Sequence, residues 1–302
     1  MDTKPMMPSE MVMDVSDISR KYLDVPYCTR SEAQKLDIFL PDEGDGPFPV
    51  VINIHGGGFE SGIKRETMMR PMLEGTRQYG FAYVLVEYRL TTEAPFPACL
   101  DDVKAAIRFL RANAAKYQLD PDKIAVMGSS AGGWLAGAAA ATGDNPMFED
   151  RSMGNPNMST KVSCCVTEYG VFDVGGNETM VQADGFPVTP PPPGAPVMDE
   201  NAGTRMLNRF MGFEAKQNPG LQRLVCVYNM VTRDMPPILI QHGGADNVAS
   251  PRQSIGLKET VDKVCGPDRA ELDIIPGNSH IGPDFYTQKN IDRVMGFIAC
   301  HI

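Results

Sequence analysis

Histidine, tryptophan and positive charge are all scarce in this 302-residue chain. It has four histidines and one tryptophan, and its 28 Lys and Arg stand against 38 Asp and Glu, a formal net charge of −10. Nucleic-acid binding depends on clustered Lys and Arg that neutralise phosphates, so this balance argues against a nucleic-acid partner. Few histidines also mean that a general base of this residue type has few candidates.

Long hydrophobic runs are missing as well. No run approaches the roughly 18 apolar residues that a membrane-spanning helix needs. Residues 1–20 are polar and acidic and lack the apolar core of a secretory signal. We therefore expect no membrane partner and a cytoplasmic location, with a removed leader as the alternative.

Paired cysteine motifs are absent. The seven cysteines are scattered, odd in number and include no Cys-x-x-Cys, which predicts buried free thiols in a reducing compartment and no disulfide framework. The His, Cys, Asp and Glu residues show no metal-ligand spacing. We expect neither a metal nor another cofactor.

The residues that are present predict an α/β fold. The composition is that of a globular protein, with 42% hydrophobic and 22% charged residues. Apolar runs at 49–54 and 82–88 predict strands covered on both faces. Further predicted strands lie at 35–41, 123–127, 162–169, 237–241 and 272–275, and helices at 100–117, 134–141, 251–264 and 288–300. This alternation predicts a mostly parallel sheet with helices on both faces.

One long stretch interrupts the alternation. Residues 174–235 separate two predicted strands by far more than a short crossover, with prolines concentrated at 187–196 and a helical pattern near 201–213. The prolines favour a stiff linker or lid element over a recognition ligand. Long insertions in compact domains usually serve the site. We predict a single domain over 1–302, with 174–235 as a cap or lid inserted in it.

The most specific motif is Gly128-Ser129-Ser130-Ala131-Gly132, between a predicted strand and a helix of small residues. In that context Gly-x-Ser-x-Gly forms a sharp turn that presents the serine hydroxyl above a helix N-terminus, where negative charge is favoured. The glycines let strand and helix approach closely. A five-residue match fits an ordinary glycine-rich turn equally well, so the rest of the chain must decide.

A serine nucleophile needs a base, an acid that orients the base, and donors for the oxyanion. One known arrangement places nucleophile, acid and histidine in that chain order. We predict Ser130 as nucleophile and His280, in a turn after the last predicted strand, as base. Asp246, after the penultimate strand, is the predicted acid; helix capping is its alternative role, and Asp173 is the weaker alternative acid.

The other histidines have other predicted roles. His242, at a strand end, is predicted to be structural, and His301 to belong to a loose tail. His55 opens the segment His55-Gly56-Gly57-Gly58, where it is predicted to organise the loop.

Three consecutive glycines expose backbone N–H groups without obstruction by side chains. The N–H groups of Gly57, Gly58 and Ala131 are the predicted oxyanion hole. A plain glycine turn is the alternative, which the joint occurrence of this segment and the serine motif disfavours.

These motifs, together with Glu87-Tyr88-Arg89-Leu90, Pro95-Phe96-Pro97-Ala98 and residues 120–124 and 235–243, resemble the α/β-hydrolase esterases. The chain is most similar to the branch with feruloyl and acetyl-xylan esterases, near the hormone-sensitive-lipase-like carboxylesterases, over about residues 35–300. Ser129 stands where lipase-like relatives often have Asp, which favours the first branch. The resemblance implies an α/β-hydrolase fold and the site roles given above.

The resemblance also implies an activity. We expect a serine carboxylesterase that acts on short acyl esters through an acyl-enzyme on Ser130. The expectation that its substrates are acetyl or feruloyl esters of plant-derived sugars rests on family analogy alone. An amidase or formamidase with the same triad is the first alternative, and a non-catalytic binding protein on this fold is the second. The expected partner is a small-molecule ester, and the oligomeric state stays open.

Overall fold

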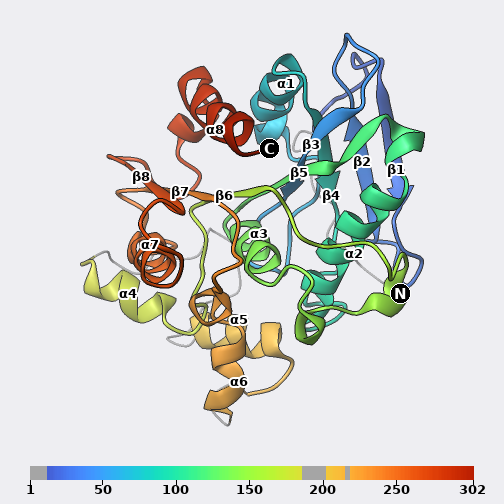
Figure 1. Ribbon diagram of the computed structural model, residues 1–302. Coiled ribbons are helices and arrows are strands. Elements are labelled where there is room, and N and C mark those ends of the chain that lie inside the picture. The colour runs from blue at the N-terminus through green and yellow to red at the C-terminus, as the bar shows by residue number, and fades with distance from the viewer. Residues whose placement is uncertain (1–11, 186–201, 215–217) are drawn as a thin grey trace.

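An eight-stranded sheet forms the centre of the molecule, seen in a computed structural model that describes residues 12–185, 202–214 and 218–302 (Figure 1). The strand order is β1-β2-β4-β3-β5-β6-β7-β8. The first two neighbour pairs, β1–β2 and β2–β4, are antiparallel, and all later pairs are parallel. The strands are β1 (Lys21–Pro26), β2 (Lys35–Phe39), β3 (Phe48–Ile54), β4 (Ala82–Val86), β5 (Leu119–Ser129), β6 (Cys164–Glu168), β7 (Ile238–Gly243) and β8 (Ala270–Ile275).

Helices cover both faces of this sheet, which confirms the predicted α/β architecture (Figure 1). On one face α1 (Arg70–Gln78) and α8 (Gln288–His301) lie side by side. On the other face lie α2 (Ala98–Ala112), α3 (Ala131–Ala141) and α7 (Arg252–Cys265). Each face therefore has its own hydrophobic core.

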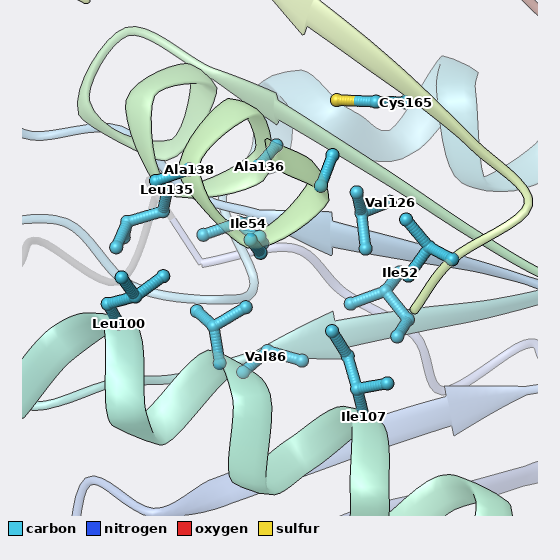
Figure 2. Close-up of a cluster of buried hydrophobic side chains, with 14 of the residues drawn as sticks. Ile52, Ile54, Val86, Leu100, Ile107, Val126, Leu135, Ala136, Ala138 and Cys165 are labelled. Carbon is cyan, nitrogen blue, oxygen red and sulfur yellow. The ribbon is translucent and has the colours of Figure 1, made fainter. Parts of the chain in front are cut away.

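The two cores follow from the alternation of side chains along each strand. Val51 packs in the core with α1 and α8, whereas its neighbour Ile52 packs in the core with α2 and α3. Figure 2 shows the second core, in which Leu100 and Ile107 of α2 point toward the strands beside Val86. The inner strands have continuous apolar sequences because both of their faces are buried.

Small residues bring α3 close to the sheet. All 11 of its residues are buried. A Cβ on Gly132 would overlap the carbonyl oxygen of Ile54, and a Cβ on Gly128 would overlap the carbonyl oxygen of Gly132. Gly132 is therefore needed for the turn to pack against β3, and Gly128 is needed for the end of β5 to pack against the first turn of α3.

Several boundaries differ from the predicted ones. The predicted helix 100–117 is two elements, α2 and the 3-10 helix η3 (Ala114–Tyr117), because α2 ends at Ala112. The prediction also missed β1, an edge strand with mostly exposed residues and no apolar alternation, and it missed α1.

The insertion at 174–235 contains α4 (Asn177–Ala183), α5 (Ala202–Met211), α6 (Pro219–Leu224) and the 3-10 helix η7 (Val227–Met230). The proline-rich segment 187–196 lies outside the described residues. Elsewhere, the predicted loose tail at His301 is wrong. His301 is the last residue of α8, and its Nδ1 lies 2.8 Å from the carbonyl oxygen of Phe297.

The cysteines are free, as predicted, but the prediction that they are buried is only partly right. Four are buried, Cys28 and Cys265 are half-buried, and Cys300 is exposed. In the part of the chain that the structure describes, no helix is long and apolar enough to cross a membrane.

Candidate active site

Ser130 lies on a strained turn between β5 and α3. Its backbone has φ 53° and ψ −119°, outside the regions that a non-glycine residue normally adopts. Its N–H donates a hydrogen bond of 2.9 Å to the carbonyl oxygen of Glu168 on the neighbouring β6. Such strain is concentrated at functional sites, where surrounding structure holds it in place.

Three side chains that the sequence places 116 and 34 residues apart meet at the carboxyl edge of the sheet. His280 Nε2 lies 3.0 Å from Ser130 Oγ, and His280 Nδ1 lies 2.7 Å from Asp246 Oδ2. If Nδ1–H donates to the carboxylate, Nε2 is left free to accept the serine proton. The structure thus brings the predicted nucleophile, base and acid together in one chain of hydrogen bonds.

Asp246 is fully buried and its pKa is lowered. Burial alone would raise that pKa, but hydrogen bonds from His242 and His280 and from the backbone N–H of Ala249 lower it further than burial raises it. The group is therefore a carboxylate at neutral pH, as an acid that orients a histidine must be.

The structure also bears on the alternative role of Asp246 as a helix cap and on Asp173 as the alternative acid. Asp246 Oδ1 accepts hydrogen bonds of 2.9 Å from the N–H groups of Val248 and Ala249, so it shapes the turn ahead of α7 as well as contacting His280. Asp173 instead accepts from the N–H of Gly176 at 3.1 Å, in the turn that precedes α4.

His242 lies beneath Asp246. It is fully buried, with Nε2 3.2 Å from Asp246 Oδ2 and 3.0 Å from the carbonyl oxygen of Ala249. Its Nδ1 lies 2.7 Å from Ser254 Oγ on α7. These contacts agree with the predicted structural role of His242. They also show that a second histidine contacts Asp246, for which the four-residue spacing between the two residues was the only signal in the sequence.

The glycine segment after β3 lies directly against the nucleophile. A Cβ on Gly56 would be 3.2 Å from Ser130 Cβ. Gly57 and Gly58 have φ values of 109° and 61°, and a Cβ on Gly57 would overlap the carbonyl oxygen of Ser61. Glycine is therefore required there, and both backbone N–H groups belong to the loop beside Ser130 and Ala131.

His55 anchors this loop. Its ring stacks on Tyr88 at 4.3 Å between centroids, and its Nδ1 lies 2.8 Å from the carbonyl oxygen of Gly56. The Tyr88 hydroxyl donates to the carbonyl oxygen of His55 at 3.0 Å. His55 Nε2 is 3.3 Å from Glu87 Oε1. The His55 ring is therefore held on several sides, as the predicted organising role requires.

Two residues near the site were not predicted from the sequence. Tyr169 follows β6 and meets the His280 ring edge-on at 4.8 Å. Its hydroxyl lies 2.8 Å from that of Tyr286. Glu168, at the end of β6, is fully buried, and neither carboxyl oxygen has a hydrogen-bond partner among the described residues. Burial raises the pKa of Glu168 to about 8.

This arrangement suits acyl transfer. It offers a hydroxyl beside an imidazole, a buried carboxylate behind the imidazole, and backbone donors beside the hydroxyl. Within residues 12–185, 202–214 and 218–302, no group of His, Cys, Asp and Glu is arranged to hold a metal ion.

A mostly parallel sheet with a serine on a strained strand-to-helix turn is the architecture of the α/β-hydrolases. The comparison with known families agrees with this fold. The chain belongs to the BD-FAE family, whose model matches residues 36–261. The resemblance predicted from the sequence motifs is thereby confirmed.

Named relatives are esterases. The chain is 28% identical over 243 residues to the probable carboxylic ester hydrolase LipM of Mycobacterium tuberculosis, covering 80% of this chain and 52% of LipM. The structure resembles a truncated carbohydrate esterase from gut microbiota with a TM-score of 0.79 and 26% identity, covering 96% of this chain and 99% of that one. It also resembles a bifunctional GH43-CE protein of Bacteroides eggerthii, with a TM-score of 0.78 and 27% identity, covering 93% of this chain and 35% of that one. The chain spans about half the length of LipM and of a second curated relative, the esterase LipQ of the same organism.

Proposed function

We propose that this protein is a serine carboxylesterase that hydrolyses short-chain acyl esters through an acyl-enzyme on Ser130. The observation that carries the proposal is the continuous chain of contacts from Ser130 through His280 to Asp246, with distances of 3.0 and 2.7 Å. The esterase names of the relatives support it.

The proposed reaction has two halves. His280 Nε2 takes the proton of Ser130 as the hydroxyl oxygen attacks the ester carbonyl carbon, and the backbone N–H groups of Gly57, Gly58 and Ala131 bind the oxyanion. His280 then gives the proton to the leaving alcohol, and the acyl group stays on Ser130. In the second half His280 activates a water molecule, which releases the acid and restores the serine.

Acetyl or feruloyl esters of plant-derived sugars are the proposed substrates. The name of one structural neighbour, a carbohydrate esterase, supports an ester carried on a sugar. We further propose that residues 1–302 form one domain and that 174–235 is a cap within it. Support comes from the insertion itself, where the carbonyl oxygen of Val225 accepts a hydrogen bond of 2.9 Å from the indole N–H of Trp134 on α3.

Hydrolysis of p-nitrophenyl acetate by the wild type and by Ser130→Ala tests the proposal. We expect the variant to lose at least about 1,000-fold in kcat, as losses of triad members do. Ser279→Ala is the matched control, because this exposed hydroxyl next to His280 should leave kcat within about twofold.

Full activity of Ser130→Ala would refute the assignment of Ser130 as the nucleophile. Turnover of an acetyl ester and of the matching acetamide distinguishes an esterase from an amidase. Faster turnover of the amide would show that the protein is an amidase and would overturn the proposed esterase activity.

A further inference from the structure

Helix α5 of the insertion packs onto the loop that carries the proposed oxyanion donors. Phe210 of α5 is fully buried, and its ring centroid lies 4.3 Å from that of Phe59. Phe59 directly follows Gly58 in the chain. Phe210 also meets Trp134 edge-on at 5.2 Å, on the helix that begins just after Ser130. One aromatic ring of the insertion thus contacts both sides of the site.

Two polar contacts hold α5 in the same place. The carbonyl oxygen of Phe210 accepts a hydrogen bond of 2.7 Å from the N–H of Phe96. Arg209 Nη1 lies 2.7 Å from Glu60 Oε2, one residue beyond Phe59. The ring of Phe210 and the charged side chain of Arg209 thus bind α5 to the loop at 59–60, and the backbone of α5 is bound to Phe96.

The loop needs such support. Gly57 and Gly58 have positive φ, and glycine is the residue with the most backbone freedom to lose. Phe59 has φ 64°, which is unfavourable for a bulky residue. From one side Thr91 fixes Phe59, since its N–H donates to the Phe59 carbonyl oxygen at 2.8 Å. On the ring side Phe59 packs against Phe210 at 4.3 Å and against Trp134 at 5.7 Å, and Phe210 is the neighbour that the insertion supplies.

A third side chain of α5 lies close to Gly58. The Sδ atom of Met206, one turn before Phe210 on α5, would lie 3.7 Å from a Cβ on Gly58. The thioether therefore lies beside the peptide whose N–H is proposed to bind the oxyanion. Along α5, Met206, Arg209 and Phe210 have the i, i+3 and i+4 spacing that places side chains on one helix face.

We propose that Phe210 is a positioning residue of the reaction: by packing on Phe59 it holds the N–H groups of Gly57 and Gly58 where they bind the oxyanion. This inference rests on the proposed esterase function. It assigns the insertion a part in the chemical step, because preorganised donors stabilise the transition state without reorganisation. A cap that only covered the substrate would affect substrate binding alone.

The test compares Phe210→Ala and Phe210→Leu with a control at another buried phenylalanine. Phe297→Leu is that control, because Phe297 is buried in α8 on the opposite face of the sheet. For each variant kcat and KM for p-nitrophenyl acetate are measured, with the inhibition constant of a trifluoromethyl ketone whose adduct on serine carries an oxyanion. Thermal unfolding identifies temperatures at which every variant is folded.

We expect Phe210→Ala to lower kcat about tenfold or more, with KM within about threefold, because a misplaced donor approaches the effect of a lost one. Ketone affinity should fall by a similar factor, and Phe210→Leu should lie between. Phe297→Leu should lower the unfolding temperature yet keep kcat and ketone affinity.

A second set of variants avoids the core. Arg209 and Glu60 have side chains that are 52% and 30% exposed, so charge reversal does not threaten folding. Arg209→Glu and Glu60→Arg should each lower kcat and ketone affinity about twofold to threefold, and the double variant should restore both.

The possible failures are distinguishable. If Ser130→Ala removes hydrolysis but Phe210→Ala keeps both kcat and ketone affinity, the positioning role is wrong and the esterase stands. If Phe210→Ala does not fold, charge reversals that leave ketone affinity unchanged overturn the inference. If Ser130→Ala keeps full hydrolysis, the proposed function itself is wrong.

Discussion

Asp246 accepts hydrogen bonds from two histidines and two backbone N–H groups. These contacts outweigh the burial that would raise its pKa, so that its charge persists at neutral pH. We predict that Asp246→Asn lowers kcat about 10,000-fold, because an amide cannot hold the imidazole in the tautomer that accepts the serine proton.

The matched control is Asp173→Asn, since Asp173 was the alternative acid and its turn contact with Gly176 survives in an asparagine. It should keep kcat within about threefold of the wild type. Equal losses in the two variants, each shown to be folded by circular dichroism, would contradict the assignment of the acid.

Glu168 makes stability depend on pH. Burial raises its pKa from 4.5 to about 8, so between these values the folded state holds a proton that the unfolded state has released. The free energy of unfolding therefore falls as pH rises from about 4.5 to 8. Glu168→Gln removes this loss, and its stability relative to the wild type should improve by on the order of 4 kcal/mol between pH 4.5 and 8.

Urea unfolding at a series of pH values measures this difference. Glu93→Gln, at an exposed glutamate, is the control and should track the wild type at every pH. Parallel pH curves for Glu168→Gln and the wild type would show that Glu168 is ionised in the folded protein.

At the scale of the elements, the packing of α3 depends on its glycines. A Cβ on Gly132 would overlap the carbonyl oxygen of Ile54, whereas a Cβ on Gly296 of α8 would meet no atom within 4 Å. The same change to alanine should therefore have opposite effects. Gly132→Ala should destabilise by about 1–3 kcal/mol through overpacking, and Gly296→Ala should stabilise by about 0.5–1 kcal/mol through helix propensity. Denaturant unfolding of the two variants checks the signs, and a neutral Gly132→Ala would contradict the close packing of α3.

Elements were predictable where local pattern and burial agree. The inner strands are buried on both faces, so their apolar runs were visible. Gly-x-Ser-x-Gly located the turn into α3, although the predicted start of the helix at 134 lies three residues after the observed start at Ala131. Edge strand β1 was not predictable, because its exposed residues have no apolar alternation. The docking of α5 depends on contacts between Phe210 and residues more than 100 positions away, which no local pattern encodes.

At the scale of the molecule, the site forms because five parallel strand pairs point the same way. The loops after β3, β5, β7 and β8 meet at one edge, so the glycine segment, Ser130, Asp246 and His280 converge although they span most of the chain. Chain order and strand ends made this convergence predictable. The second histidine on Asp246, the rings of Tyr169 and Tyr286, and the buried Glu168 were not predictable, because each depends on side-chain packing across strands.

The central claim is that Ser130 carries the acyl group during turnover. Acid quenching of the wild type in the presence of excess p-nitrophenyl acetate, followed by peptide mass mapping, tests it most directly. We predict one acetyl group per chain, on Ser130, that is absent from the Ser130→Ala protein. Continued turnover with no acetyl group on Ser130, or with a label on another residue that Ser130→Ala retains, would contradict the account.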